Sequence, residues 1–173
     1  MTNDSTSPGS SVDWAYLLAN LGTIVVRQAK HYSCRLPLFG RPHSHEDRFH
    51  FSYVRSGKCR IRIDETALSV GADDLVFIRP GQVHESLGDK QVDYELIELR
   101  VSVDADADRT LIPAFKPVTH IDNAAVFFPI LERVVTAYQL DPFPENWLVR
   151  VRLVEMMMVL AREEGPLTST LTD

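Results

Sequence analysis

Short runs of β-branched and aromatic residues follow one another from residue 23 to about residue 120, with turn residues between them. Regularly spaced runs of this length are typical of a β-sandwich or a closed β-barrel. The pattern predicts strands at Thr23–Gln28, Tyr32–Pro37, Phe49–Arg55, Lys58–Asp64, Thr66–Val70, Asp73–Ile78, Glu85–Leu87, Val92–Val101 and Val118–Ile121.

A Ser-Gly pair at 56–57 lies between two of these strands. Glycine tolerates the positive φ that tight turns require, so the pair predicts a β-hairpin. In the strand that follows, Ile61 and Ile63 alternate with arginines. One face of that strand is therefore expected to be buried, and the other to be in water or to line a polar interior.

Towards the C-terminus the apolar residues change to a helical spacing. The first helix is predicted to begin near Phe128, with Pro129 in its first turn, and to end before Asp141. Pro144 is placed to open a second helix, which runs to about Glu164. The chain is thus expected to add two helices to its predicted strands.

The second predicted helix has more apolar surface than packing against one wall of a barrel requires. Either a second buried contact covers it, as in a homodimer, or a groove of its own domain clasps it, and both interpretations stay open. One broad face carries Trp147, Leu148, Val151, Val154, Met157, Met158 and Ala161, and Leu153, Met156 and Leu160 extend it. The candidate dimer interface is Trp147, Val151, Val154, Met157 and Met158.

Composition limits the class of protein further. The chain has 173 residues, of which 45% are apolar and 24% charged, and this size and mix fit one globular domain. Its net charge of −6 argues against direct binding to nucleic acid, which depends on clustered Lys and Arg. No apolar run approaches the roughly 18 residues that a membrane helix needs, so no membrane partner is expected.

The N-terminus and the cysteines indicate the compartment. Residues 1–11 are polar and lack the basic and apolar blocks of a signal peptide. Cys34 and Cys59 form no short-spaced metal pair and no disulfide framework, so we interpret them as reduced core residues. A cytoplasmic location is expected.

Four of the six histidines lie in two compact blocks of the sequence. His43 and His45 are two residues apart, so on a strand they project from the same face and can converge on one ion or ligand. His50 follows in the same block, and His84 lies in the second block, three residues after Gly81. We predict these four histidines as the metal-ligating or ligand-binding group, whereas His31 and His120 lie outside both blocks.

Three or four imidazoles suit Zn, Ni, Cu or Fe(II) and hold magnesium or calcium poorly. A divalent transition metal is therefore the expected cofactor, and an all-histidine shell can hold catalytic zinc. The alternative is that the histidines are hydrogen-bonding groups of a metal-free pocket. Strand alternation places Ser52 and Val54 on the inward face with His50, as candidate pocket residues, and leaves Phe51 and Tyr53 on the other face.

The segment from residue 41 to residue 84 resembles the cupin superfamily. The first cupin motif is H-x-H, three or four residues, Glu, six residues and Gly, and the second ends in Gly, two residues and His. Both spacings are kept, but His50 stands where cupin enzymes usually place a metal-ligating Glu, and Glu46 and Asp47 are out of register. The resemblance implies an all-β fold, a cupin double-stranded β-helix (jelly-roll) barrel, followed by the two C-terminal helices.

The order of parts also resembles the N-terminal sensor domain of AraC-type transcription regulators. We expect a disordered arm at 1–12, the barrel at 13–121, a dimerising helical pair at 122–165 and a tail or linker at 166–173. The resemblance implies that the barrel senses a small-molecule effector, that the helices form a homodimer, and that DNA is bound only through a C-terminal domain absent from this chain. The chain is either a sensor domain taken from a longer regulator or a stand-alone protein.

Two other classes of function compete with the sensor. A small metal-dependent cupin enzyme of the dioxygenase or isomerase type would use the same histidines, with His50 as a proton-transfer group. The missing Glu and the lack of an evident general base argue against an enzyme, and we assign no catalytic residue. The third class is a binding or storage module without signalling.

Overall fold

The computed structural model describes residues 12–34, 40–87, 93–143 and 145–165. Its helices are α1 (Trp14–Ala19), α2 (Ala124–Leu140) and α3 (Trp147–Glu163), with short 3-10 turns η1 (Leu21–Thr23) and η2 (Arg109–Leu111). Its strands are β1 (Ile24–Cys34), β2 (Phe49–Ser56), β3 (Cys59–Ile63), β4 (Thr66–Val70), β5 (Asp74–Ile78), β6 (His84–Leu87), β7 (Tyr94–Val103) and β8 (Val118–His120).

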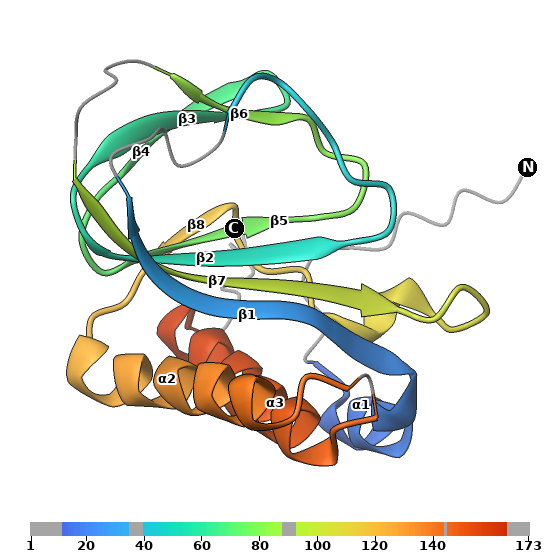
Figure 1. The fold of residues 1–173 in the computed structure, drawn as a ribbon. Helices are drawn as coiled ribbons and strands as arrows, with labels where there is room; N and C mark the ends of the chain where they lie inside the picture. Colours follow the sequence, from blue (N-terminus) through green and yellow to red (C-terminus); the bar gives the residue numbers. More distant parts are fainter. Residues whose placement is uncertain (1–11, 35–39, 88–92, 144, 166–173) are drawn as a thin grey trace, which may run out of the picture.

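The strands form two antiparallel sheets that face each other (Figure 1). The larger has the order β1-β7-β2-β5-β8 and the smaller the order β4-β3-β6. Helices α2 and α3 cover the outer face of the larger sheet, so the molecule has three layers (Figure 1). The expected all-β class is therefore too narrow: the fold is a cupin-like β-sandwich with two C-terminal helices.

The two faces of the larger sheet have different environments because side chains alternate along each strand. On β2, Phe51 and Tyr53 belong to the apolar core shared with α2 and α3, whereas Val54 belongs to a second apolar cluster between the sheets. The remaining buried members of that second cluster are Ile61, Ile63, Val70, Val76, Ile78, Tyr94 and Leu96.

The predicted hairpin at Ser56-Gly57 is wrong. Strand β2 pairs with β5 and β7, and β3 pairs with β4 and β6, so the chain changes sheets at this point. Gly57 has a φ of +97°, as a tight change of direction requires, but it joins two layers rather than two paired strands.

The N-terminal part of the sheet also differs from the expectation. A single strand, β1, covers residues 24–34, where two strands were predicted at 23–28 and 32–37, and it pairs with β7 along nearly its whole length. The pairing shifts register between Val26 and Gln28. The last part of the second predicted strand, residues 35–37, lies outside the described residues. Helix α1, which the sequence pattern did not indicate, begins after Asp13, whose side chain accepts a hydrogen bond from the backbone N–H of Tyr16 (2.9 Å).

Both C-terminal helices exist, but their starts differ from the prediction. Helix α2 begins at Ala124 rather than near Phe128, so Pro129 lies inside it. Proline has no N–H, so the carbonyl of Ala125 lacks its usual hydrogen bond within the helix. Pro129 and Ala125 are both exposed, so water can donate to this carbonyl instead. Helix α3 begins at Trp147, after the N-cap Asn146, and not at Pro144, which lies outside the described residues.

The buried face of α3 is rotated from the expected one. Val154 and Met157 are buried in the chain's own core, so they are not available as the dimer-interface residues that we predicted. Trp147 and Val151, from the same predicted set, are exposed, and Met158 is half-buried. A second contact for this helix stays a prediction, limited to its exposed residues.

Three further expectations concern the chain ends, the cysteines and the membrane. The expected arm, apart from Val12, and the expected tail at 166–173 lie outside the described residues. Cys59 is a half-buried free thiol whose pKa is raised by burial, and the side chain of Cys34 is not among those described. Within the described ranges, no helix is long and apolar enough to span a membrane.

Candidate metal and ligand site

Two backbone connections bring the two histidine blocks together. The N–H of His84 donates to the carbonyl of His43 (2.9 Å), and the N–H of His43 donates back to the carbonyl of His84 (3.2 Å). The N–H of Gly81 donates to the carbonyl of His45 (2.9 Å). The segment before β2 is thereby fixed against the start of β6, and His50 joins it from β2 itself.

A buttressed turn sets the position of His84. Gly81 has a φ of +83°, which favours glycine, and the side chain of Gln82 accepts a hydrogen bond from the N–H of Arg79 (2.9 Å). The carboxylate of Asp64 then accepts from the Gln82 side chain (2.9 Å) and from the N–H of Val83 (3.0 Å). The second block of the sequence motif is therefore a rigid turn that aims one side chain.

The four predicted histidines adjoin one another. Ligand nitrogens of His43, His45 and His84 all lie within 4.8 Å of each other, a group compact enough to hold a metal ion. The ring of His50 stacks on that of His45, with centroids 4.7 Å apart, and lies 5.4 Å from that of His84. We refer to these four residues as the histidine cluster.

Hydrogen bonds fix which nitrogen of two rings faces the cluster. The Nδ1 of His43 lies 2.8 Å from the carbonyl of Arg41, and the Nδ1 of His84 lies 3.0 Å from the carbonyl of Gln82. A carbonyl only accepts, so Nδ1 carries the proton and Nε2 keeps its lone pair. This backbone support is the usual one for metal-ligating histidines.

His50 differs because neither of its ring nitrogens has such support within the described part of the chain. Its side chain is only 2% exposed, and neither ring nitrogen has a hydrogen-bond partner among the described residues. An unpartnered buried imidazole costs free energy unless something else contacts it. The donor set and this orphaned ring both fit a bound metal ion or an organic ligand.

Three histidines of the cluster have lowered pKa values. Burial, followed by the charge of His45 and that of Arg100, lowers the pKa of His50 to about 3. Burial is also the largest cause that lowers the pKa values of His45 and His84. Neutral imidazoles are the form that binds a metal, so protons would compete little with an ion at these positions.

Ser52 and Val54 lie as strand alternation predicts, on the same face of β2 as His50. Both are buried. His31 and His120 lie apart from the cluster and contact carboxylates instead: Glu95 at 3.0 Å and Asp74 at 2.8 Å. The role of Ser52 and Val54 in binding an effector stays a prediction.

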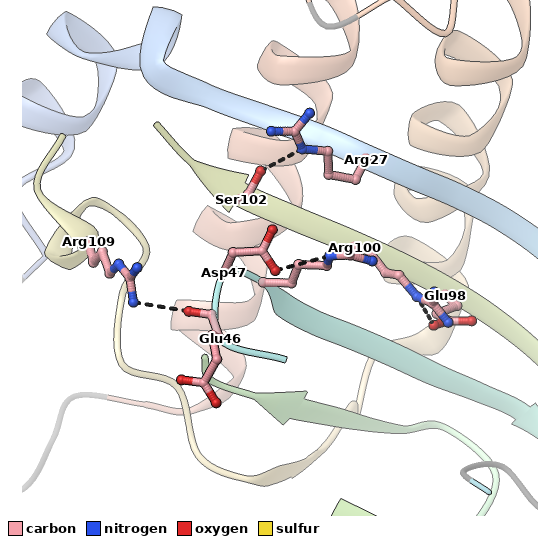
Figure 2. Close-up of polar contacts among 8 residues, drawn as sticks. Arg27, Glu46, Asp47, Glu98, Arg100, Ser102 and Arg109 are labelled. Carbon is pink, nitrogen blue, oxygen red and sulfur yellow. Dashed lines mark hydrogen bonds and ion pairs between the residues drawn. The ribbon is translucent and has the colours of Figure 1, made fainter. Parts of the chain in front are cut away.

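The same interior face carries a polar group that the sequence analysis missed. Glu98 is 7% exposed, and its Oε1 accepts from the Nε of Arg100 (2.6 Å) (Figure 2). Its Oε2 accepts from the hydroxyl of Tyr32 (3.0 Å). Across the strands, Arg100 is opposite His50 and Glu98 is opposite Ser52. The alternating charges at 93–100 were the available signal, but a shift of one residue reverses which of them face inward.

Further polar contacts hold the segment that carries His43 and His45. The guanidinium of Arg109, on η2, donates to the backbone carbonyl of Glu46 (3.1 Å) (Figure 2). Arg48 forms an ion pair with the neighbouring Asp47 (3.2 Å). The carboxylate of Glu46 accepts from the hydroxyl of Ser44 (3.3 Å), and neither Glu46 nor Asp47 belongs to the compact metal-binding group.

A β-sandwich that holds a histidine cluster between its sheets has the architecture of a cupin-type ligand-binding domain. The family described as AraC-like ligand binding domain matches residues 31–118, and the chain belongs to this family. No curated protein matches the chain.

Similar solved structures include cupin proteins. A predicted oxalate decarboxylase from Thermotoga maritima is 18% identical (TM-score 0.40; 45% of this chain, 68% of that one). The Cnp3 cupin domain of Schizosaccharomyces pombe is 10% identical, with a TM-score of 0.37, and the match covers 44% of this chain and 55% of that one. A cupin protein from Bacteroides fragilis is 22% identical, with a TM-score of 0.36, and the match covers 67% of this chain and 98% of that one.

Proposed function

We propose that the chain is the ligand-sensing and dimerisation domain of an AraC-type transcription regulator. In this proposal a small effector binds at the histidine cluster, either directly or through a divalent transition metal. The family supports a sensing role, and the observation that carries the site is the buried ring of His50, whose nitrogens have no partner among the described residues. A bound ion would supply a Lewis-acidic position for an oxygen or nitrogen of the effector.

Strand β2 offers a physical route from the site to the helices. His50, Ser52 and Val54 face the interior, whereas the ring of Tyr53, on the opposite face, lies 5.8 Å from that of Phe127 on α2. An effector that fits one arrangement of this strand better than another shifts the population of helix positions. A differential affinity of 100-fold corresponds to about 2.7 kcal/mol of coupling.

In the proposed regulator, the helices pair two copies of the chain and a separate C-terminal domain contacts DNA. The net charge of −6 supports the assignment of DNA binding to a separate domain, because the sensing domain itself has no excess of cations to bind phosphates. Two paired copies would suit an operator with two half-sites.

The first experiment is elemental analysis of protein purified without chelator or affinity nickel. We expect about one zinc, nickel or iron ion per chain, and loss of that ion in a variant with His43→Ala and His45→Ala. A variant with His31→Ala and His120→Ala is the matched control and should keep it. Metal retained by the first variant would exclude the cluster as its site.

A protein that purifies without metal would leave the direct form of the proposal, in which an organic effector contacts the imidazoles. Thermal-shift titration with a metabolite library would then reveal a saturable stabilisation that the His43→Ala, His45→Ala variant lacks. Oxygen consumption by iron-loaded protein, or turnover of small phenols or keto acids, would favour a metal-dependent cupin enzyme instead.

A further inference from the structure

Arg100 is the charged interior residue that lies directly opposite His50. On β7, its neighbours Leu99 and Val101 pack in the core shared with the helices, so Arg100 points to the other face, between the sheets. In register it lies between His50 on β2 and Gln28 on β1. The three side chains thus form one row across the larger sheet, next to the histidine cluster.

Glu98 holds this guanidinium by one nitrogen only. Its Oε1 accepts from the Nε of Arg100 at 2.6 Å, and its Oε2 is occupied by the hydroxyl of Tyr32 and, at 3.4 Å, by the side chain of Gln28. Neither terminal nitrogen of Arg100 has a hydrogen bond within the described part of the chain, and the side chain is 31% exposed. The guanidinium is therefore oriented, charged and still able to donate.

The surrounding groups leave that charge as the main feature for a ligand to recognise. His50 occupies the place of a carboxylate in the cupin motif, so the histidine cluster itself has no carboxylate that could pair with the guanidinium. Both oxygens of Glu98 already accept hydrogen bonds, so Glu98 serves as a positioning residue. A metal ion held by neutral imidazoles would keep its full charge and add to the same preference.

We propose that Arg100 determines the specificity of the effector site and that the effector is a small carboxylate. The two terminal N–H groups of Arg100 would bind the carboxylate in a forked, charge-assisted pair, while the rest of the molecule contacts the histidine cluster. The proposal deepens the sensing function and rests on it, because it names the chemical class of the effector.

The test compares carboxylates with their uncharged amides. Lactate, oxalate, benzoate and salicylate, and lactamide, oxamide, benzamide and salicylamide, are titrated by calorimetry into the protein as purified and after zinc loading. At least one carboxylate should bind tenfold or more tightly than its amide. Arg100→Gln should abolish this preference, and the matched control Arg60→Gln, an exposed arginine on β3, should keep it.

Two further measurements separate failure of the proposal from loss of the fold or of the function. Arg100→Lys retains the charge but not the fork, so it should keep part of the preference, and both Arg100 variants should keep wild-type metal content. Equal binding of acid and amide, no binding of any carboxylate, or an unchanged preference in a folded Arg100→Gln protein would each overturn the proposal. The sensing function is decided separately, by the His43→Ala, His45→Ala variant.

Discussion

Gly57, at the point where the chain passes from the larger sheet to the smaller one, is a position that only glycine fits. Its φ is +97°, and a Cβ added there would lie 2.7 Å from the backbone oxygen of Asp93 and 2.8 Å from a ring carbon of Tyr94. Real Cβ atoms do not approach other atoms so closely, and neither the backbone nor a buried ring can yield easily.

Gly57→Ala is therefore expected to lower the free energy of unfolding by at least about 1–3 kcal/mol, the usual cost of a residue held in an unfavourable backbone region. Urea denaturation followed by circular dichroism measures this change. Gly40→Ala is the control, because a Cβ there meets nothing within 4 Å and its φ is not positive. Similar losses in the two variants would contradict the steric explanation.

His120 gives the stability a dependence on pH. Its Nδ1 lies 2.8 Å from the carboxylate of Asp74, and this hydrogen bond raises the pKa of His120, with smaller contributions from the charges of Asp122 and Asp73. A raised pKa means that the folded state binds the proton more tightly than the unfolded chain does. The stabilisation is fully present below the unfolded pKa of about 6.5 and is lost as the pH rises through the folded value.

His120→Gln should accordingly reduce the urea midpoint at pH 5.5 and leave it nearly unchanged at pH 8.5. The effect is expected to be small because His120 is exposed to solvent, which screens the pair. Unfolding curves of both proteins at the two pH values give the comparison. A difference of the same size at both values would mean that the imidazolium charge is not its cause.

Helix α3 depends on the side chain of Asn146 for its start. The side-chain oxygen accepts from the N–H of Val149 (3.2 Å), and the side-chain nitrogen donates to the carbonyls of Asp141 (2.6 Å) and Ala137 (3.2 Å). One side chain thus satisfies the first turn of α3 and two carbonyls at the end of α2.

Asn146→Ala should reduce the free energy of unfolding by about 1–2 kcal/mol, the range measured for side-chain N-caps. Asn123→Ala, at the N-cap of α2, is the control, because the Asn123 side chain makes no capping hydrogen bond. Guanidinium denaturation of the two variants is the measurement. If Asn123→Ala lowered stability as much as Asn146→Ala, the capping contacts would not account for the loss.

At the scale of elements, the sequence predicted best what local patterning controls. Strand β4 has the predicted bounds, Thr66–Val70, because turns close it on both sides. The middle of β1, residues 29–31, was missed because Lys30 and His31 are polar and interrupt the apolar pattern. Its continuity comes from pairing with β7, about seventy residues away, and no local pattern encodes that contact.

The candidate site, too, was predictable where local spacing determines it and not where contacts between distant strands do. The histidine cluster was predictable because the spacing within each block, together with the motif, determines which rings converge. Glu98 and Arg100 were not, because their strand has apolar residues on both faces and charge alone does not select the inward one. On α3, apolar residues surround the helix, so the sequence left its rotation open, and Val154 and Met157 were assigned to the dimer interface although they are buried in the chain's own core.

At the scale of the whole molecule, several large apolar side chains remain exposed around the α2–α3 connection. Phe143 is 71% and Trp147 58% exposed, and Leu140, Leu148 and Val151 are also exposed. The opposite face of helix α3 packs in the chain's own core. If the helices pair two copies of the chain, these residues are the apolar surface available for the contact.

A variant with Leu148→Glu and Val151→Glu should therefore shift a dimer towards the monomer while keeping its thermal unfolding temperature within a few degrees. Sedimentation velocity over a range of concentrations gives the dissociation constant, which we expect to rise at least about tenfold, a change of roughly 1.4 kcal/mol. Val83→Glu is the control, because Val83 is exposed beside the histidine cluster. A wild-type protein that sediments as a monomer would contradict this arrangement.

The pairing of β1 with β7 also determines the order in which the molecule can assemble. Residues 24–34 find their partners only at residues 94–103, and both histidine blocks lie in the stretch between them. During synthesis, the first strand must wait until some seventy later residues have left the ribosome. Because such long-range closure is slow, the docking of β1 is expected to be a late step of folding. The histidine cluster joins residues that are closer together in the sequence, so a ligand could bind there before the first strand is in place.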